Sequence, residues 1–191
     1  PYTPNGKIDR KMLPEINIDN VDVDCLNREY TGKPLIPTGT PQTSTQPYQS
    51  NLVALEQAVL SKILEMYPDG TKIHINSSYR SPEENARIEG SAKNSQHCCG
   101  EAVDFTVRIN GQMEDVIETA KKIVNNANIP FDQLIFEKNN RVKWVHISYT
   151  NSVSKCTGSK NRRNIYKAIW DESGGKYKYI AIRDINKVTS F

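Results

Sequence analysis

Two histidines and one aspartate in this chain of 191 residues are of the types that bind catalytic zinc. His97 precedes Asp104 by seven residues, and His146 follows further along the chain. Two imidazoles and one carboxylate leave a fourth position around the ion for water, whose pKa the metal lowers to about 7. A carboxylate beside that water can take its proton and pass it to a leaving amine, and Glu137 is the candidate. Residue type by itself is weak evidence, because most His and Asp residues are structural or exposed.

Strand periodicity gives a second reason to bring these residues together. Side chains alternate between the two faces of a strand, so each expected strand has a core face and an opposite face. The expected strands are 102–109, 133–137 and 142–149, and their core sets are Val103, Phe105 and Val107, then Leu134 and Phe136, then Val145 and Ile147. Asp104, Glu137 and His146 each lie opposite the core set. The pattern therefore predicts that all three project from one face of a sheet.

The position of Glu137 depends on the hairpin that joins its strand to the strand of His146. Opposed residues of an antiparallel pair share a face, and an even-length loop sets Glu137 opposite Val142 or Trp144. Pairing with Trp144 places Glu137 diagonal to His146, within reach of the metal site. A β-bulge would instead turn Glu137 away. His97 is expected on a loop that enters the sheet, and Gly100 would let that loop pass close to the sheet.

The remaining elements predict an α+β fold with a mostly antiparallel sheet flanked by helices. Apolar residues recur at helical spacing from Leu52 to Met66 and again from Val116 to Val124. A short helix is expected after Ser81, with Pro82 in its first turn and Glu84 completing a capping box. Further strands are expected at 72–76, 164–170 and 176–182. Strands and helices alternate without a regular βαβ repeat, which favours the antiparallel arrangement.

Composition limits the partners and the domain organisation. The net charge of +3, from 25 basic and 22 acidic residues, is too small to indicate nucleic-acid binding. No apolar run is long enough to span a bilayer, and no signal-peptide core is visible, so the localisation is left open. Residues 1–49 are rich in Pro, Thr, Ser and Gln and are interpreted as an extended arm or linker. The domain itself is expected over 50–185, with 186–191 as a tail.

Several ordered motifs resemble the zinc D-Ala-D-Ala carboxypeptidase family, including its phage-type peptidoglycan peptidases. The stretch INSSYRSPEENARIEGSAKNSQHCCGEAVDF contains a Y-R-S-P turn, a helix and then S-Q-H-x-x-G-x-A-x-D, and FDQLIFE and WVHISY resemble the family's closing hairpin. The resemblance implies a Hedgehog/DD-peptidase-like fold and a zinc ion held by His97, Asp104 and His146. It also implies a metallopeptidase, a carboxypeptidase or an endopeptidase, that cuts peptidoglycan stem peptides next to D-alanine. Arg80 and Ser95 would bind the substrate, Arg80 by pairing bidentately with a peptide carboxylate.

The sequence departs from the family pattern in two places. Some members have a catalytic Glu three residues before the last His, where this chain has Lys143, so the base must be Glu137. Cys98 and Cys99 directly follow His97, and either thiol could compete for zinc. The four cysteines, Cys25, Cys98, Cys99 and Cys156, form neither a C-x-x-C motif nor an obvious disulfide framework, and Cys98 and Cys99 are interpreted as small packing residues.

Other interpretations stay open for these residues. Glu137 could form a cross-strand salt bridge, Arg80 could tie a loop to an acid or a helix end, and His74 could be an ordinary strand histidine. The first residues, PYTPNGKIDRKMLPE, resemble the closing motif of nonribosomal peptide synthetase adenylation domains, with Lys7 as the motif lysine. Alternatives to a peptidase are therefore a zinc-containing binding module of the same fold and a fragment of such a synthetase. The oligomeric state is not predicted.

Overall fold

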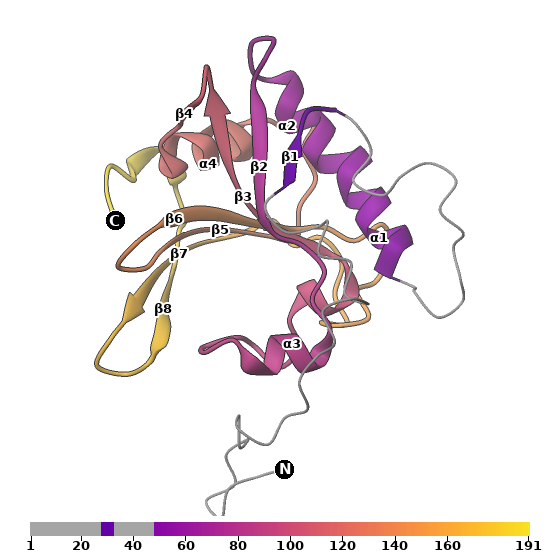
Figure 1. Cartoon of the computed structure of the whole chain (residues 1–191), viewed down its shortest axis with the longest axis vertical. Coiled ribbons are helices and arrows are strands. Elements are labelled where there is room, and N and C mark those ends of the chain that lie inside the picture. Colours follow the sequence, from indigo (N-terminus) through magenta and orange to yellow (C-terminus); the bar gives the residue numbers. More distant parts are fainter. Residues whose placement is uncertain (1–27, 33–47) are drawn as a thin grey trace, which may run out of the picture.

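The computed structural model describes residues 28–32 and 48–191 of the chain. Most of the expected arm, including the synthetase-like segment at 1–14 and Cys25, lies outside these residues. In the described part, eight strands form one sheet in the order β1-β2-β3-β6-β5-β7-β8, with β4 paired to β3 (Figure 1). Every pairing is antiparallel except that of β5 with β7. The expected α+β class with a largely antiparallel sheet is confirmed.

The central strands agree closely with the alternation in the sequence. They are β2 (Lys72–Ser77), β3 (Ala102–Ile109), β5 (Gln133–Lys138) and β6 (Lys143–Ser148). The outer hairpin is β7 (Asn164–Asp171) and β8 (Lys176–Ala181), and the two short strands are β1 (Arg28–Tyr30) and β4 (Gln112–Met113). The core sets of the three predicted strands are fully buried. Period-two alternation therefore identified the buried face of the sheet.

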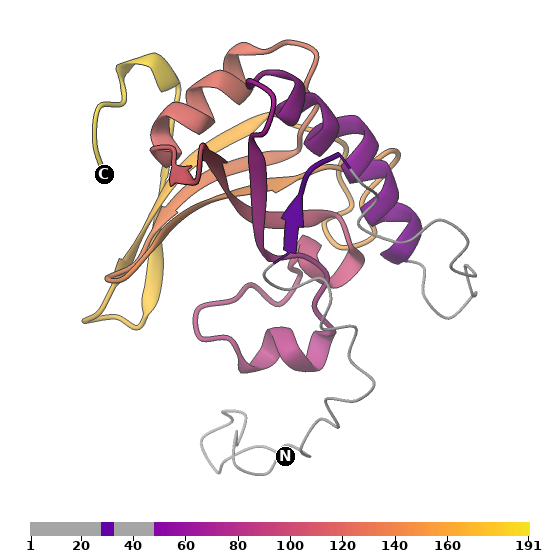
Figure 2. The same cartoon turned by 45° about the horizontal axis from the view of Figure 1, so that its top comes forward.

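Helices cover that buried face. A long helical segment runs through α1 (Tyr48–Leu55), a π-helical turn (Glu56–Leu60) and α2 (Ser61–Glu65), and α4 (Val116–Asn125) lies beside it (Figures 1 and 2). Their apolar side chains, among them Leu55, Ile63, Ala120 and Ile123, join the core face of the sheet in one hydrophobic cluster. No helix among the described residues is long and apolar enough to cross a membrane.

The opposite face of the sheet looks toward α3 (Pro82–Arg87). The β7–β8 end of the sheet curves to the same side (Figure 1). The expected capping box starts α3, since Ser81 accepts from the Glu84 backbone and the Glu84 carboxylate accepts from the Ser81 backbone. Helices on one side of the sheet thus leave the other side free for a cleft.

One part of the expected arm packs on the domain. Arg28–Tyr30 forms β1 and pairs with β2, and the Tyr30 side chain is 3% exposed within the core cluster. Tyr48 and Gln49 belong to α1. At the other end, Phe191 packs edge-to-face on Phe136, so the expected tail also contacts the domain. Short strands of this kind lack a hydrophobic pattern long enough to be recognised in sequence.

Candidate metal centre

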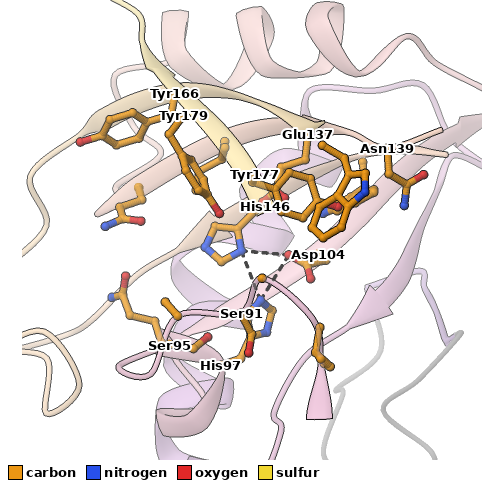
Figure 3. A pocket seen from close by; sticks show the side chains of 18 of the residues that line it. Ser91, Ser95, His97, Asp104, Glu137, Asn139, His146, Tyr166, Tyr177 and Tyr179 are labelled. Atoms are coloured by element: carbon orange, nitrogen blue, oxygen red, sulfur yellow. Dashed lines mark hydrogen bonds and ion pairs between the residues drawn. The ribbon is translucent and has the colours of Figure 1, made fainter. Parts of the chain in front are cut away.

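Asp104 and His146 face each other across neighbouring strands. The register of β3 and β6 pairs them directly, on the face opposite the core, as strand alternation predicts. His146 Nδ1 lies 2.9 Å from Asp104 Oδ1 (Figure 3). Both side chains line a cleft of about 1030 Å³ between the sheet and the 88–97 segment.

His97 completes the cluster from a 3-10 turn, Gln96–Cys99, that leads into β3. Its Nδ1 lies 2.6 Å from the carbonyl oxygen of Ser78. A carbonyl oxygen only accepts hydrogen bonds, so His97 Nδ1 carries the proton and Nε2 presents its lone pair to the cleft. Nε2 lies 3.2 Å from both Asp104 Oδ1 and His146 Nδ1.

Three contacts hold the turn that carries His97 in position. The Asn51 side chain of α1 donates to the Cys99 carbonyl at 2.8 Å. Gly100 has a φ of +67°, and a Cβ there would collide with the Tyr48 carbonyl oxygen. Gly100 therefore comes close to α1. The sequence had suggested a close approach to the sheet instead. Cys99 is joined to Cys156 by a disulfide.

That disulfide corrects the interpretation of the cysteines. Cys99 is a cross-link between the His97 turn and the 150–163 loop, not a small packing residue, and it has no thiol to offer a metal. Among the described residues, Cys98 is the free cysteine, and burial raises the pKa of its thiol. The bond brings together residues 57 positions apart, which cysteine spacing alone does not show.

The three ligand atoms fit a metal ion. His97 Nε2, Asp104 Oδ1 and His146 Nδ1 form a group of one ligand atom each, all within 4.8 Å of one another. Atoms about 2.0–2.1 Å from a tetrahedral ion lie about 3.3 Å apart, close to the separations of 2.9–3.2 Å found here. A lone pair on neutral His97 pointing at a carboxylate oxygen is unfavourable unless a cation lies between them.

The pKa shifts of His97 and Asp104 agree with such a site. Burial lowers the pKa of His97, which favours the neutral imidazole that metals bind. Burial alone would raise the pKa of Asp104, but the two neighbouring histidines hold it well below its usual range. Burial would lower the pKa of His146, but the hydrogen bond to Asp104 and the charges of Asp104 and Glu137 together raise it.

Glu137 lies on the same face, one step along β5 from the row of Asp104 and His146. It pairs with Trp144, while its neighbour on that face, Ile135, pairs with His146. Of the two registers open in sequence, the one diagonal to His146 is therefore present. The Glu137 side chain is 7% exposed, and burial, followed by the charge of Asp104, raises the pKa of its carboxyl to about 8. No hydrogen bond from the described residues reaches this carboxyl.

Arg80 and Ser95 both line the cleft. The Arg80 backbone donates to the His97 carbonyl at 3.3 Å, and its guanidinium charge partly opposes the rise in the pKa values of His146 and Glu137. Ser95 precedes the His97 turn and lies at its start (Figure 3). His74 pairs with Glu29 and Thr106 and does not line the cleft.

Aromatic residues of the outer hairpin form a wall of the cleft that sequence reasoning missed. Trp170 lies edge-to-face on Tyr177, with ring centroids 5.0 Å apart. The Tyr177 centroid lies 6.2 Å from that of Trp144 and 6.3 Å from that of Tyr179. The wall also meets the opposite side, because a Cβ on Gly90 would lie 2.9 Å from the Trp170 ring. The sequence signal that could have indicated this wall is the even spacing of aromatic residues along 166–170 and 177–179.

Comparison with known families adds to this geometry. Residues 36–148, more than half of the chain, match the model of a family described as Peptidase M15. The chain belongs to the peptidase M15 family. The match confirms the resemblance noted in the sequence and supports a metallopeptidase, since this family is zinc-dependent. The matched residues include His97, Asp104, Glu137 and His146. In this M15 peptidase, Cys156 and the aromatic residues of β7 and β8 follow the matched residues. No curated protein is significantly similar to the chain.

Proposed function

We propose that this M15 peptidase is a zinc enzyme with a Hedgehog/DD-peptidase-like fold that hydrolyses bacterial cell-wall peptides next to D-alanine. The observation that supports it best is the convergence of His97 Nε2, Asp104 Oδ1 and His146 Nδ1 within hydrogen-bonding distance of one another. These three residues would hold the zinc. When bound, zinc acidifies a water molecule and polarises a carbonyl oxygen.

Glu137 is the proposed general base. Its carboxylate takes a proton from the attacking water and passes it to the nitrogen of the departing amine. Burial raises the pKa of the Glu137 carboxyl, which favours its proton uptake from water and opposes the effect of a bound cation. A cation held by the three ligands would lower this pKa, so Glu137 would start the reaction ionised.

Asp132 is a poor alternative base. It is fully buried, and the Arg162 guanidinium donates to both of its oxygens at 2.6 and 2.8 Å. The Arg162 backbone donates to the same carboxylate. The carboxylate of Asp132 is thus already paired with Arg162, away from the cleft.

Arg80 and Ser95 are proposed to bind the peptide. Nε of Arg80 is buried without a hydrogen-bond partner among the described residues, and its side chain lines the cleft. A buried donor without a partner is costly, and a substrate carboxylate would satisfy it while pairing with the guanidinium. A free terminal carboxylate at Arg80 favours trimming of a terminal residue.

Digestion of purified peptidoglycan with the zinc-loaded protein tests this function. Mass spectrometry of the soluble products should show free D-alanine for a carboxypeptidase, or larger peptides for an endopeptidase. Zinc-dependent binding to peptidoglycan without release of any fragment would contradict the proposal and indicate a binding module of the same fold.

A further inference from the structure

Tyr179 lies in the same row of the sheet as Glu137. Glu137 of β5 pairs with Ala168 of β7, and Ala168 pairs with Tyr179 of β8. Ala168 is fully buried and has only a methyl group. The small residue between them leaves room above β7 for the Tyr179 ring to lean toward the metal cluster.

The ring does point that way. Figure 3 shows Tyr179 directed from β8 into the cleft, toward His146, with its hydroxyl leading. Tyr179 lines the cleft, and the charges of Glu137 and Asp104 both act on its phenol. Its side chain is 53% exposed, so a ligand can reach it.

The position of the ring is supported by its neighbours. Tyr177 contacts Tyr179 with ring centroids 6.3 Å apart, and Tyr177 is itself packed edge-to-face on Trp144 and Trp170. Contacts of this kind fix ring orientation and reduce the entropy lost when a substrate binds. The hydroxyl of Tyr179 is therefore presented from a preformed wall.

The three tyrosines of the cleft differ in what their hydroxyls face. The Tyr177 phenol interacts with the Asn139 side chain. Tyr166 points away from His146 (Figure 3). The Tyr179 hydroxyl has no hydrogen-bond partner among the described residues, although it faces the cluster. A donor without a partner, aimed at a reacting centre, is the arrangement that stabilises developing negative charge.

We propose that the Tyr179 hydroxyl donates a hydrogen bond to the carbonyl oxygen of the peptide bond being cut, which makes Tyr179 a catalytic residue. This inference rests on the proposed peptidase function. The hydrogen bond strengthens as that oxygen gains negative charge during attack, and the phenol keeps its proton throughout. Tyr179 acts from the sheet, while Arg80 acts from the α3 side. Tyr179 lies beyond residues 36–148, which match the family model.

The test is a kinetic comparison of single hydroxyl deletions in the zinc-loaded protein. Tyr179→Phe keeps the ring and should lower kcat about a hundredfold, the effect of removing one donor to a developing oxyanion. KM, zinc content and melting temperature should stay as in the wild type. Tyr149→Phe is the matched control, because Tyr149 does not line the cleft, and it should keep full activity.

A phosphinate analogue of the tetrahedral intermediate gives a second readout. Its affinity should fall in Tyr179→Phe by the same factor as kcat/KM, because both report transition-state contacts. Unchanged kcat, a rise in KM alone, or a loss of activity that follows zinc loss would each overturn the role of Tyr179. An inactive zinc-loaded wild type would overturn the proposed function as well. An active wild type with an equally active Tyr179→Phe would overturn only the role of Tyr179.

Discussion

Asp104 of β3 and His146 of β6 are directly opposed residues of one antiparallel pair, with Oδ1 and Nδ1 2.9 Å apart. This pairing makes the candidate metal centre a property of the sheet register. A slip of one residue in either strand would move one ligand to the core face. The apolar neighbours Val103, Phe105, Val145 and Ile147 oppose such a slip, because each would then face the cleft.

The first prediction concerns the metal. His146→Ala and His97→Ala should each abolish stoichiometric zinc binding, measured by metal analysis of the purified protein. They should also remove the rise in melting temperature that zinc gives, because a metal bound only by the folded state stabilises it. His74→Ala is the control, since His74 does not line the cleft. Full zinc occupancy in both cluster variants would refute the ligand assignment.

The second prediction concerns Arg80. Arg80→Lys should lower kcat/KM for a peptide with a free terminal carboxylate by about tenfold or more, because an ammonium cannot replace a bidentate guanidinium. Zinc content should not change. Arg87→Lys, on α3 and outside the cleft lining, should behave as wild type. Equal kinetics for the two variants would remove Arg80 from the site.

The third prediction concerns the disulfide. Cys156→Ser releases the turn that carries His97 and should destabilise the protein by about 4 kcal/mol, given a sequence separation of 57. Zinc affinity should fall with it, because the free His97 turn must then be ordered on binding. Calorimetric unfolding and zinc titration measure the two effects, with Cys98→Ser as the control. Wild-type zinc affinity in Cys156→Ser would show that the other contacts of the turn suffice.

A fourth prediction concerns the arm. The sequence indicates an extended arm or linker over residues 1–49, but β1 and the start of α1 lie within that range. A chain lacking residues 1–32 should therefore be less stable than one lacking 1–27, by about 1.5–3 kcal/mol for the lost burial of Tyr30. Denaturant unfolding of both chains measures the difference. Equal stabilities would show that β1 contributes nothing.

Local sequence patterns predicted well which residues share the face of the candidate metal centre. The period of two in 102–109 and 142–149 assigns Asp104 and His146 to one face regardless of the rest of the fold, and the capping box at Ser81 is equally local. The aromatic wall was not predictable in this way, because β7 reaches the site through a parallel pairing with β5 that sequence order does not indicate. The Cys99–Cys156 bond and the contact of Gly100 with Tyr48 likewise depend on segments far apart in the chain.

The measurement that tests the account most directly is the turnover of Glu137→Gln with zinc fully bound. The substitution keeps the shape of the side chain but removes its ability to take a proton. It should keep the fold and the zinc and lower kcat on a cell-wall peptide by at least about a hundredfold. Glu118→Gln, at an exposed position of α4, should leave kcat unchanged. A Glu137→Gln protein that binds zinc and cleaves the peptide at the wild-type rate would contradict the mechanism.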